Sequence, residues 1–179
     1  LLADMARTVD HAADGRLVLG LGSGWLARDY HDYGFAMPGD GDRIREMEAA
    51  IPRIRRRLGH LNPQPIGSVP LLIGGLGERL TLRVTARHAD LWNGWGTPDE
   101  IRHLNMVIDN HCHDVGRDPG EVLRTVALFE PGADADYDEY VRAGAQHLIL
   151  VASGPDHQID HLQGLLRWRD ERNTDREGL

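Results

Sequence analysis

The stretch that decides the fold is Val69–Arg79, VPLLIGGLGER, in which a short apolar run ends in glycines. The run Leu71–Ile73 is typical of a strand that is buried on both faces. Gly74, Gly75 and Gly77 follow at once, and a helix-like segment comes directly after them. The stretch therefore predicts a buried strand that turns tightly into a helix.

Glycines at such a junction are suited to holding a phosphate. Their backbone N–H groups meet an anion at a helix N-terminus without an intervening Cβ, and the helix dipole favours the negative charge. Arg79, one turn further, adds a guanidinium for a charge-assisted contact. The alternative interpretation is a tight turn that binds nothing, because a glycine motif alone is only a hypothesis.

Strand and helix signals alternate along the chain. Strands are expected at residues 16–22, 70–73, 90–94, 125–129 and 147–152. Helices are expected at residues 2–13, 44–58, 78–89, 97–115, 137–143 and from about 159 onward. We expect a loop at residues 23–41, a kink or break at Pro52, and fraying of the charged tail from residue 169.

Repeated strand–helix units predict a parallel sheet, either doubly wound or closed as a (β/α) barrel. The barrel is favoured because glycine-rich or aromatic segments follow three strands, at residues 22–25, 74–75 and 92–95, and a barrel collects all such segments in one site. A barrel has eight strands in about 250 residues. We therefore predict an α/β chain of the (β/α)8 TIM-barrel type, N-terminally truncated to about five units, strands four to eight, in one partial domain at residues 1–179.

Composition narrows the class of protein. The chain is 41% hydrophobic and 27% charged, has no apolar run that would cross a bilayer, and shows no leader at its start. Its net charge of −8 argues against nucleic-acid or anionic-membrane partners. Cys112 is its single cysteine, which excludes an internal disulfide and favours a cytoplasmic location. All 20 basic residues are Arg, so Schiff-base chemistry is excluded.

The order of GRLVLGLGSGW, VPLLIGGLGER, ARHADLWNGW and a late GRDP resembles that of the bacterial luciferase-like oxidoreductases, most closely their actinobacterial branch that uses the deazaflavin coenzyme F420. The resemblance extends over residues 1–173 and corresponds to strands four to eight of that barrel. It implies a reduced flavin or deazaflavin bound across the top of the barrel for hydride transfer, and for oxygen activation in flavin members.

The resemblance also implies cofactor-binding positions. The phosphate grip after the fifth strand of the family matches Gly74, Gly75 and Gly77 with the start of the next helix, Glu78 and Arg79. The loop after its fourth strand matches a second group of three residues: Gly22, Ser23 and Gly24.

No catalytic acid or base is assigned. The family's acidic proton donor, where present, follows the fourth-strand glycines, and this chain has Trp25 there. Trp25 and Trp92 are predicted to line an apolar substrate pocket, with Trp95 as a further candidate, and core or rim packing is the alternative for each. His31 is the nearest candidate acid or base, against the alternative of a solvated loop histidine.

The predicted function is hydride transfer between reduced F420 and a small organic substrate. Alternatives are an FMN-dependent luciferase-like monooxygenase, and an inactive remnant or split-barrel fragment. A dinucleotide-binding protein is a further alternative, because residues 22–27 fit a GxGxxA pattern loosely.

No metal site is predicted, because the pair His157 and His161 lacks a third ligand and the acidic run from Asp134 lacks the glycine of a calcium loop. The strands at residues 17–21 and 148–151 are expected to have unpaired edges. The chain is thus expected to aggregate, to form a homo-oligomer or to pair with a missing half-barrel, and to bind the cofactor poorly by itself.

Overall fold

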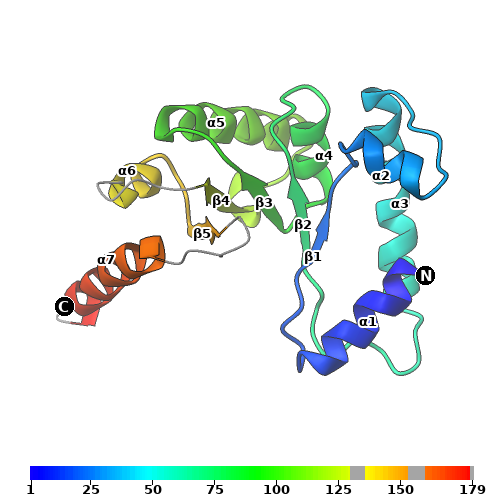
Figure 1. Cartoon of the computed structure of the whole chain (residues 1–179), viewed down its shortest axis with the longest axis horizontal. Coiled ribbons are helices and arrows are strands. Elements are labelled where there is room, and N and C mark those ends of the chain that lie inside the picture. The colour runs from blue at the N-terminus through cyan, green and yellow to red at the C-terminus, as the bar shows by residue number, and fades with distance from the viewer. Residues whose placement is uncertain (130–135, 153–159, 178–179) are drawn as a thin grey trace.

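The computed structural model describes residues 1–129, 136–152 and 160–177. Five parallel strands form one sheet in the order β1-β2-β3-β4-β5 (Figure 1). The strands are β1 Leu19–Leu21, β2 Leu71–Gly74, β3 Leu91–Gly94, β4 Leu123–Phe129 and β5 His147–Val151.

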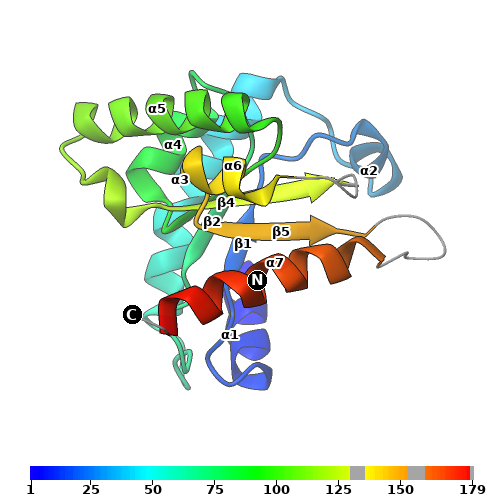
Figure 2. The ribbon, with the colours of Figure 1, turned by 90° about the vertical axis from the view of Figure 1, so that its left-hand side faces the viewer.

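The connections between the strands are helical. The helices are α1 Leu2–Ala12, α2 Ala27–Asp32, α3 Asp40–Leu58, α4 Thr81–His88, α5 Pro98–Asp114, the 3-10 turn η1 Pro119–Glu121, α6 Tyr137–Arg142 and α7 Asp160–Glu177. Figure 2 shows β4 and β5 side by side, with α5 above them and α7 below in that view. Within the described ranges, no helix combines the length and the apolar character needed to cross a membrane.

The strand order follows the chain order throughout. Each strand pairs in parallel with the next, for example Ile73 with Trp92 and Gly94 with Val126. A doubly wound sheet contains a point at which the strand order reverses, and the described sheet has none. The dinucleotide-binding alternative loses its structural basis, and β1 and β5 form the edges of the described sheet.

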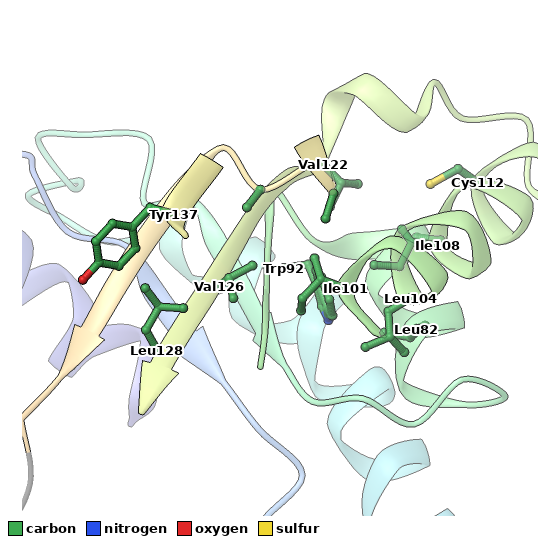
Figure 3. Close-up of a cluster of buried hydrophobic side chains, with 13 residues drawn as sticks. Leu82, Trp92, Ile101, Leu104, Ile108, Cys112, Val122, Val126, Leu128 and Tyr137 are labelled. Atoms are coloured by element: carbon green, nitrogen blue, oxygen red, sulfur yellow. The ribbon is translucent and has the colours of Figure 1, made fainter. Parts of the chain in front are cut away.

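The hydrophobic core lies between the sheet and the helices that follow each strand. One cluster packs α4 and α5 against β3 and β4, with the fully buried Trp92 beside Ile101 at its centre (Figure 3). A second cluster packs α3 and α4 against β1 and β2 and includes Ile51 and Ile73. The apolar side chains at 3- and 4-residue spacing are therefore the ones that bind each helix to the sheet.

Four local expectations were wrong. The expected loop at residues 23–41 contains α2, which an Arg28–Asp32 ion pair spans. The helix α3 has no break at Pro52, whose side chain is exposed, because Met47 and Ile51 anchor both sides of this point to the core. The start of α4 is Thr81 rather than residue 78, since the glycine turn extends over residues 75–80.

The fourth wrong expectation is the fraying of the charged tail from residue 169, because the tail is helical as far as Glu177. Trp168 explains this, because its ring stacks against Tyr137 and its Nε1–H donates to Asp138 at 3.1 Å. Arg172 also pairs with Asp138. Contacts with α6 thus hold a segment that its composition alone would leave frayed.

Candidate active site

A cavity of about 590 Å³ lies at the carboxyl ends of the strands. It is lined by residues that follow or end four strands: Gly22, Ser23, Gly24, Trp25, Gly74, Gly75, Thr81, Trp95 and Phe129. The glycine segments after β1 and β2, fifty residues apart in the chain, are thereby brought to one site. This is the end of a parallel sheet at which ligands bind in α/β folds.

Two side chains, those of Tyr30 and Arg43, hold the loop after β1 in place. Gly24 has a φ of 75°, and a Cβ there would lie 2.4 Å from the Tyr30 hydroxyl. Tyr30 donates to the Ser23 carbonyl at 3.4 Å, and the Arg43 Nε–H donates to the Gly24 carbonyl at 2.9 Å. Arg43 is itself buried and also donates to Pro38 and Asp40. The loop is therefore fixed to the start of α3.

The loop after β2 is equally constrained. Gly75 has a φ of 132°, a conformation that glycine adopts readily. Its N–H donates to the Asn93 carbonyl at 3.2 Å, and its carbonyl accepts the Trp92 Nε1–H at 2.9 Å. Among the described residues, the N–H groups of Leu76 and Gly77 have no protein acceptor. The turn between Gly75 and Thr81, two residues that line the cavity, thus contains two backbone donors that are not used within the described residues.

Thr81 is a site residue that sequence reasoning missed. It is 8% exposed and lines the cavity from the first turn of α4. A Cβ on Gly77 would lie 2.9 Å from the Thr81 Oγ1, and a Cβ on Gly75 would lie 3.1 Å from its Cγ2. The signal was present in the sequence, because a hydroxyl residue at a helix start after glycines is a frequent anion ligand.

Aromatic side chains form the outer wall. Trp25 is 81% exposed at the cavity, and Trp95 packs edge-on against Phe129 with ring centroids 6.5 Å apart. Trp92 does not line the cavity, contrary to its predicted place in the wall. Its ring lies in the core (Figure 3), and it contributes to the site only through its hydrogen bond to Gly75.

Besides Trp92, four predicted or candidate residues do not line the cavity: Gly77, Glu78, Arg79 and His31. Glu78 pairs with His103 of α5 at 3.0 Å, and Arg79 is exposed. His31 is exposed on α2, with its Nδ1 3.3 Å from Asp32. The side-chain polar groups of the described wall are thus the hydroxyls of Ser23 and Thr81 and the indole nitrogens of Trp25 and Trp95, and none of these groups titrates near neutral pH.

No group of three or more metal-ligating side chains is found among the described residues. His157 and Asp134, which belonged to the two patterns weighed for metal binding, lie outside that part of the chain. The described site therefore consists of backbone donors, two hydroxyls and an aromatic wall.

Comparison with solved structures identifies proteins that share this fold. The chain has the fold of an F420-dependent secondary alcohol dehydrogenase, solved with an F420-acetone adduct, with a TM-score of 0.69 and 13% identity over 83% of this chain and 68% of that one. The coenzyme F420-dependent tetrahydromethanopterin reductase of Methanopyrus kandleri gives a TM-score of 0.63 and 13% identity over 87% and 74% of the two chains.

A long-chain alkane monooxygenase gives a TM-score of 0.59 at 13% identity, and the chain spans only 41% of its length. No curated protein matches the chain. At these identities the structural likeness establishes the fold, an α/β fold with a five-stranded parallel sheet similar to luciferase-like barrels.

A family model described as luciferase-like monooxygenase matches residues 1–178, nearly the whole chain. The match confirms the family resemblance that the sequence motifs indicated. The chain belongs to the luciferase-like monooxygenase family.

Proposed function

We propose that the cavity binds reduced coenzyme F420 and that the chain takes part in hydride transfer between this deazaflavin and a small organic substrate. The observation that carries the proposal is the meeting of the two glycine loops around one cavity of about 590 Å³. Two solved structures with this fold are described as F420-dependent, which supports the choice of cofactor.

The residues present fit a phosphate-bearing cofactor. The N–H groups of Leu76 and Gly77 and the Thr81 hydroxyl supply donors at the start of α4. Gly22 has no atom within 4 Å of the position of a Cβ, so the space beside it is open to a ligand. Bare backbone donors at a helix N-terminus are the usual partners of phosphate oxygens.

Each part of the wall then has a distinct task. Thr81 and the glycine N–H groups anchor the cofactor, and the loop held by Arg43 limits where its ring system can lie. Trp25, Trp95 and Phe129 cover the cavity and exclude water from the apolar substrate. The deazaflavin, when bound, supplies the hydride from its ring carbon.

FMN is the second candidate cofactor. A riboflavin lyase solved with modified FMN shares the fold with a TM-score of 0.61 at 13% identity, and the same anchoring donors suit the single phosphate of FMN. With FMN bound, the proposed function becomes that of a luciferase-like monooxygenase.

Titration of the 179-residue chain with F420 and with FMN, followed by fluorescence, tests the proposal. Weak but saturable F420 binding is expected of the chain by itself. An FMN response without an F420 response would assign the site to FMN, and no response to either cofactor would favour the inactive alternative.

Thr81→Val is the decisive variant, because it removes the hydroxyl and preserves the shape of the side chain. Loss of one hydrogen bond to a charged phosphate is expected to weaken F420 binding about tenfold. Thr85→Val is the matched control, since Thr85 lies one turn further along α4, is fully buried, and its Oγ1 has no partner among the described residues. Equal F420 affinities of the two variants would contradict the assignment of Thr81.

Gly75→Val is a second variant of the same loop. It adds a side chain where φ is 132° and where a Cβ would meet Thr81. We expect loss of F420 binding with an unchanged far-ultraviolet circular dichroism spectrum. Unchanged affinity in a folded Gly75→Val chain would refute the phosphate cradle.

A further inference from the structure

A second hollow, of about 870 Å³, lies at the opposite end of the sheet between α5, α6 and α7. Strand β4 connects the two ends, because its last residue, Phe129, lines the first cavity and its second residue, Arg124, lines this cleft. The cleft therefore shares no wall with the proposed cofactor site, and an inference about it does not rest on the proposed function.

Arg124 is the central residue of the cleft. Its side chain is only 7% exposed, and its Nη2 donates to the Asp109 carboxylate at 2.7 Å. Its Nη1 is buried and has no partner among the described residues. Burial lowers the pKa of this guanidinium. A buried N–H without an acceptor costs free energy, so an acceptor atom that hydrogen-bonds to the Arg124 Nη1 would be bound favourably.

Asn105 contributes a buried acceptor atom that has no donor among the described residues. It lies one turn before Asp109 on α5 and is 9% exposed. Its Nδ2 donates to the Ala143 carbonyl at 2.8 Å, whereas its Oδ1 is buried and has no partner among the described residues. A ligand that satisfies both Arg124 and Asn105 must carry an acceptor and a donor.

The wall of the cleft is rich in further guanidinium groups. They come from three helices: Arg102 of α5, Arg142 of α6, and Arg169 and Arg172 of α7. Each is partly exposed and uses some of its N–H groups on a nearby carboxylate, as Arg102 does on Asp99. The remaining N–H groups are the donors that a tetrahedral oxyanion with several acceptor oxygens requires.

We propose that this cleft binds a phosphate group, either free or at the end of a small metabolite. Arg124 Nη1 donates to a phosphate oxygen, and a protonated phosphate oxygen donates to Asn105 Oδ1. Phosphate is partly protonated near neutral pH and thus carries both acceptors and a donor, whereas an ionised carboxylate carries acceptors alone. Phosphate is therefore the oxyanion that fits both unpaired atoms.

Binding of inorganic phosphate to the chain, followed by isothermal titration calorimetry, tests the proposal, with acetate as the comparison ligand. Phosphate is expected to bind more tightly than acetate, and its affinity is expected to fall as salt is added. Equal or tighter binding of acetate would overturn the choice of phosphate.

Two charge changes with opposite expected effects test the site itself. Asp109→Asn removes the carboxylate that competes for Arg124 and is expected to raise phosphate affinity about threefold or more. Asn105→Asp places a carboxylate where an acceptor faces the ligand and is expected to abolish binding. A change in the same direction for both variants would overturn the proposal.

A rim substitution with a matched control completes the test. Arg102→Gln removes a cleft guanidinium from an i,i+3 pair with Asp99, and Arg45→Gln removes one from an i,i+3 pair with Asp42 away from the cleft. Only Arg102→Gln is expected to weaken phosphate binding, about twofold to fivefold. Equal phosphate affinities of these two folded variants would contradict the site.

Discussion

At the scale of single residues, two glycines that both lie in strands have different roles because their neighbours differ. Gly20 and Gly94 both lie in strands, and neither has a positive φ. A Cβ on Gly20 would meet only Leu72, at 3.9 Å, whereas a Cβ on Gly94 would lie 2.3 Å from the ring of Trp92. Gly94 therefore makes room for the indole that holds Gly75, a role that no pattern in the sequence reveals.

Gly94→Ala is accordingly expected to lower the free energy of unfolding by about 1–3 kcal/mol, because the fully buried Trp92 ring has no space into which to move. Gly20→Ala is the control and should leave stability unchanged or raise it, since alanine restricts the unfolded chain. Urea denaturation measures both. Equal unfolding midpoints would show that the ring relaxes without cost.

At the scale of elements, helix ends and helix contacts are stabilised by identifiable groups. The Thr97 hydroxyl accepts the Glu100 N–H at 3.3 Å, and the Glu100 carboxylate accepts the Thr97 N–H at 2.7 Å. These two bonds form a capping box at the start of α5. The pKa of Glu100 is lowered because the Thr97 N–H and the Thr97 hydroxyl both donate to its carboxylate. The sequence TPDE predicted this helix start directly.

Thr97→Ala is expected to cost about 1 kcal/mol of stability, because the first turn of α5 loses its side-chain acceptor. Thr97→Ser keeps the hydroxyl and should retain most of that stability. Thermal unfolding followed by circular dichroism compares the two. A Thr97→Ser chain as unstable as Thr97→Ala would show that the methyl group, rather than the cap, is what matters.

The contact between α1 and α3 depends on pH. Arg57 hydrogen-bonds to Asp4 and lowers the pKa of that carboxyl from 3.8 to about 2. Because the folded pKa is the lower one, the stabilisation is complete above pH 3.8 and is lost as the pH falls through about 2.

The stability difference between the chain and Asp4→Asn should therefore shrink as the pH falls from 3.8 toward 2. Urea unfolding at several pH values measures it. In an Arg57→Gln background the same Asp4→Asn difference should be smaller and less dependent on pH, because Arg57 is the largest cause of the lowered pKa of Asp4, and the Leu1 ammonium also contributes. A pH-dependent difference that survives in this background would assign the effect to a group other than Arg57.

At the scale of the whole molecule, the described sheet is open. The edges of β1 and β5 have no strand partner among the described residues, whereas β2, β3 and β4 are paired on both sides. An unpaired edge exposes backbone donors and acceptors to other chains. The large aromatic side chains that line the cavity, Trp25, Trp95 and Phe129, are also exposed.

The 179-residue chain is therefore expected to associate with itself or with a second polypeptide that covers these edges. Size-exclusion chromatography with light scattering measures the mass, and dilution should shift it. A single monomeric peak together with one cooperative unfolding transition in denaturant would refute this expectation.

The sequence by itself determined the alternation of strands and helices, the parallel sheet, the family and the two glycine loops of the candidate site. These features depend on local periodicity, capping and glycine conformation, which residues close together in the sequence determine. The helix starting at Thr97 and the strand ending at Gly74 are examples, because each is set by residues within a few positions.

Only the tertiary structure decided which tryptophans line the cavity, that Thr81 lines it, and that Arg43 and Trp92 hold the loops in place. Trp92 lies in β3, whereas Trp95 lies beyond the end of that strand at Gly94. The alternation of side chains along a strand therefore gives the direction of the Trp92 side chain but not that of Trp95. The partner of the Trp92 indole is a carbonyl seventeen positions away, in the loop after β2. Such contacts depend on how distant segments pack, and local patterns carry no information about them.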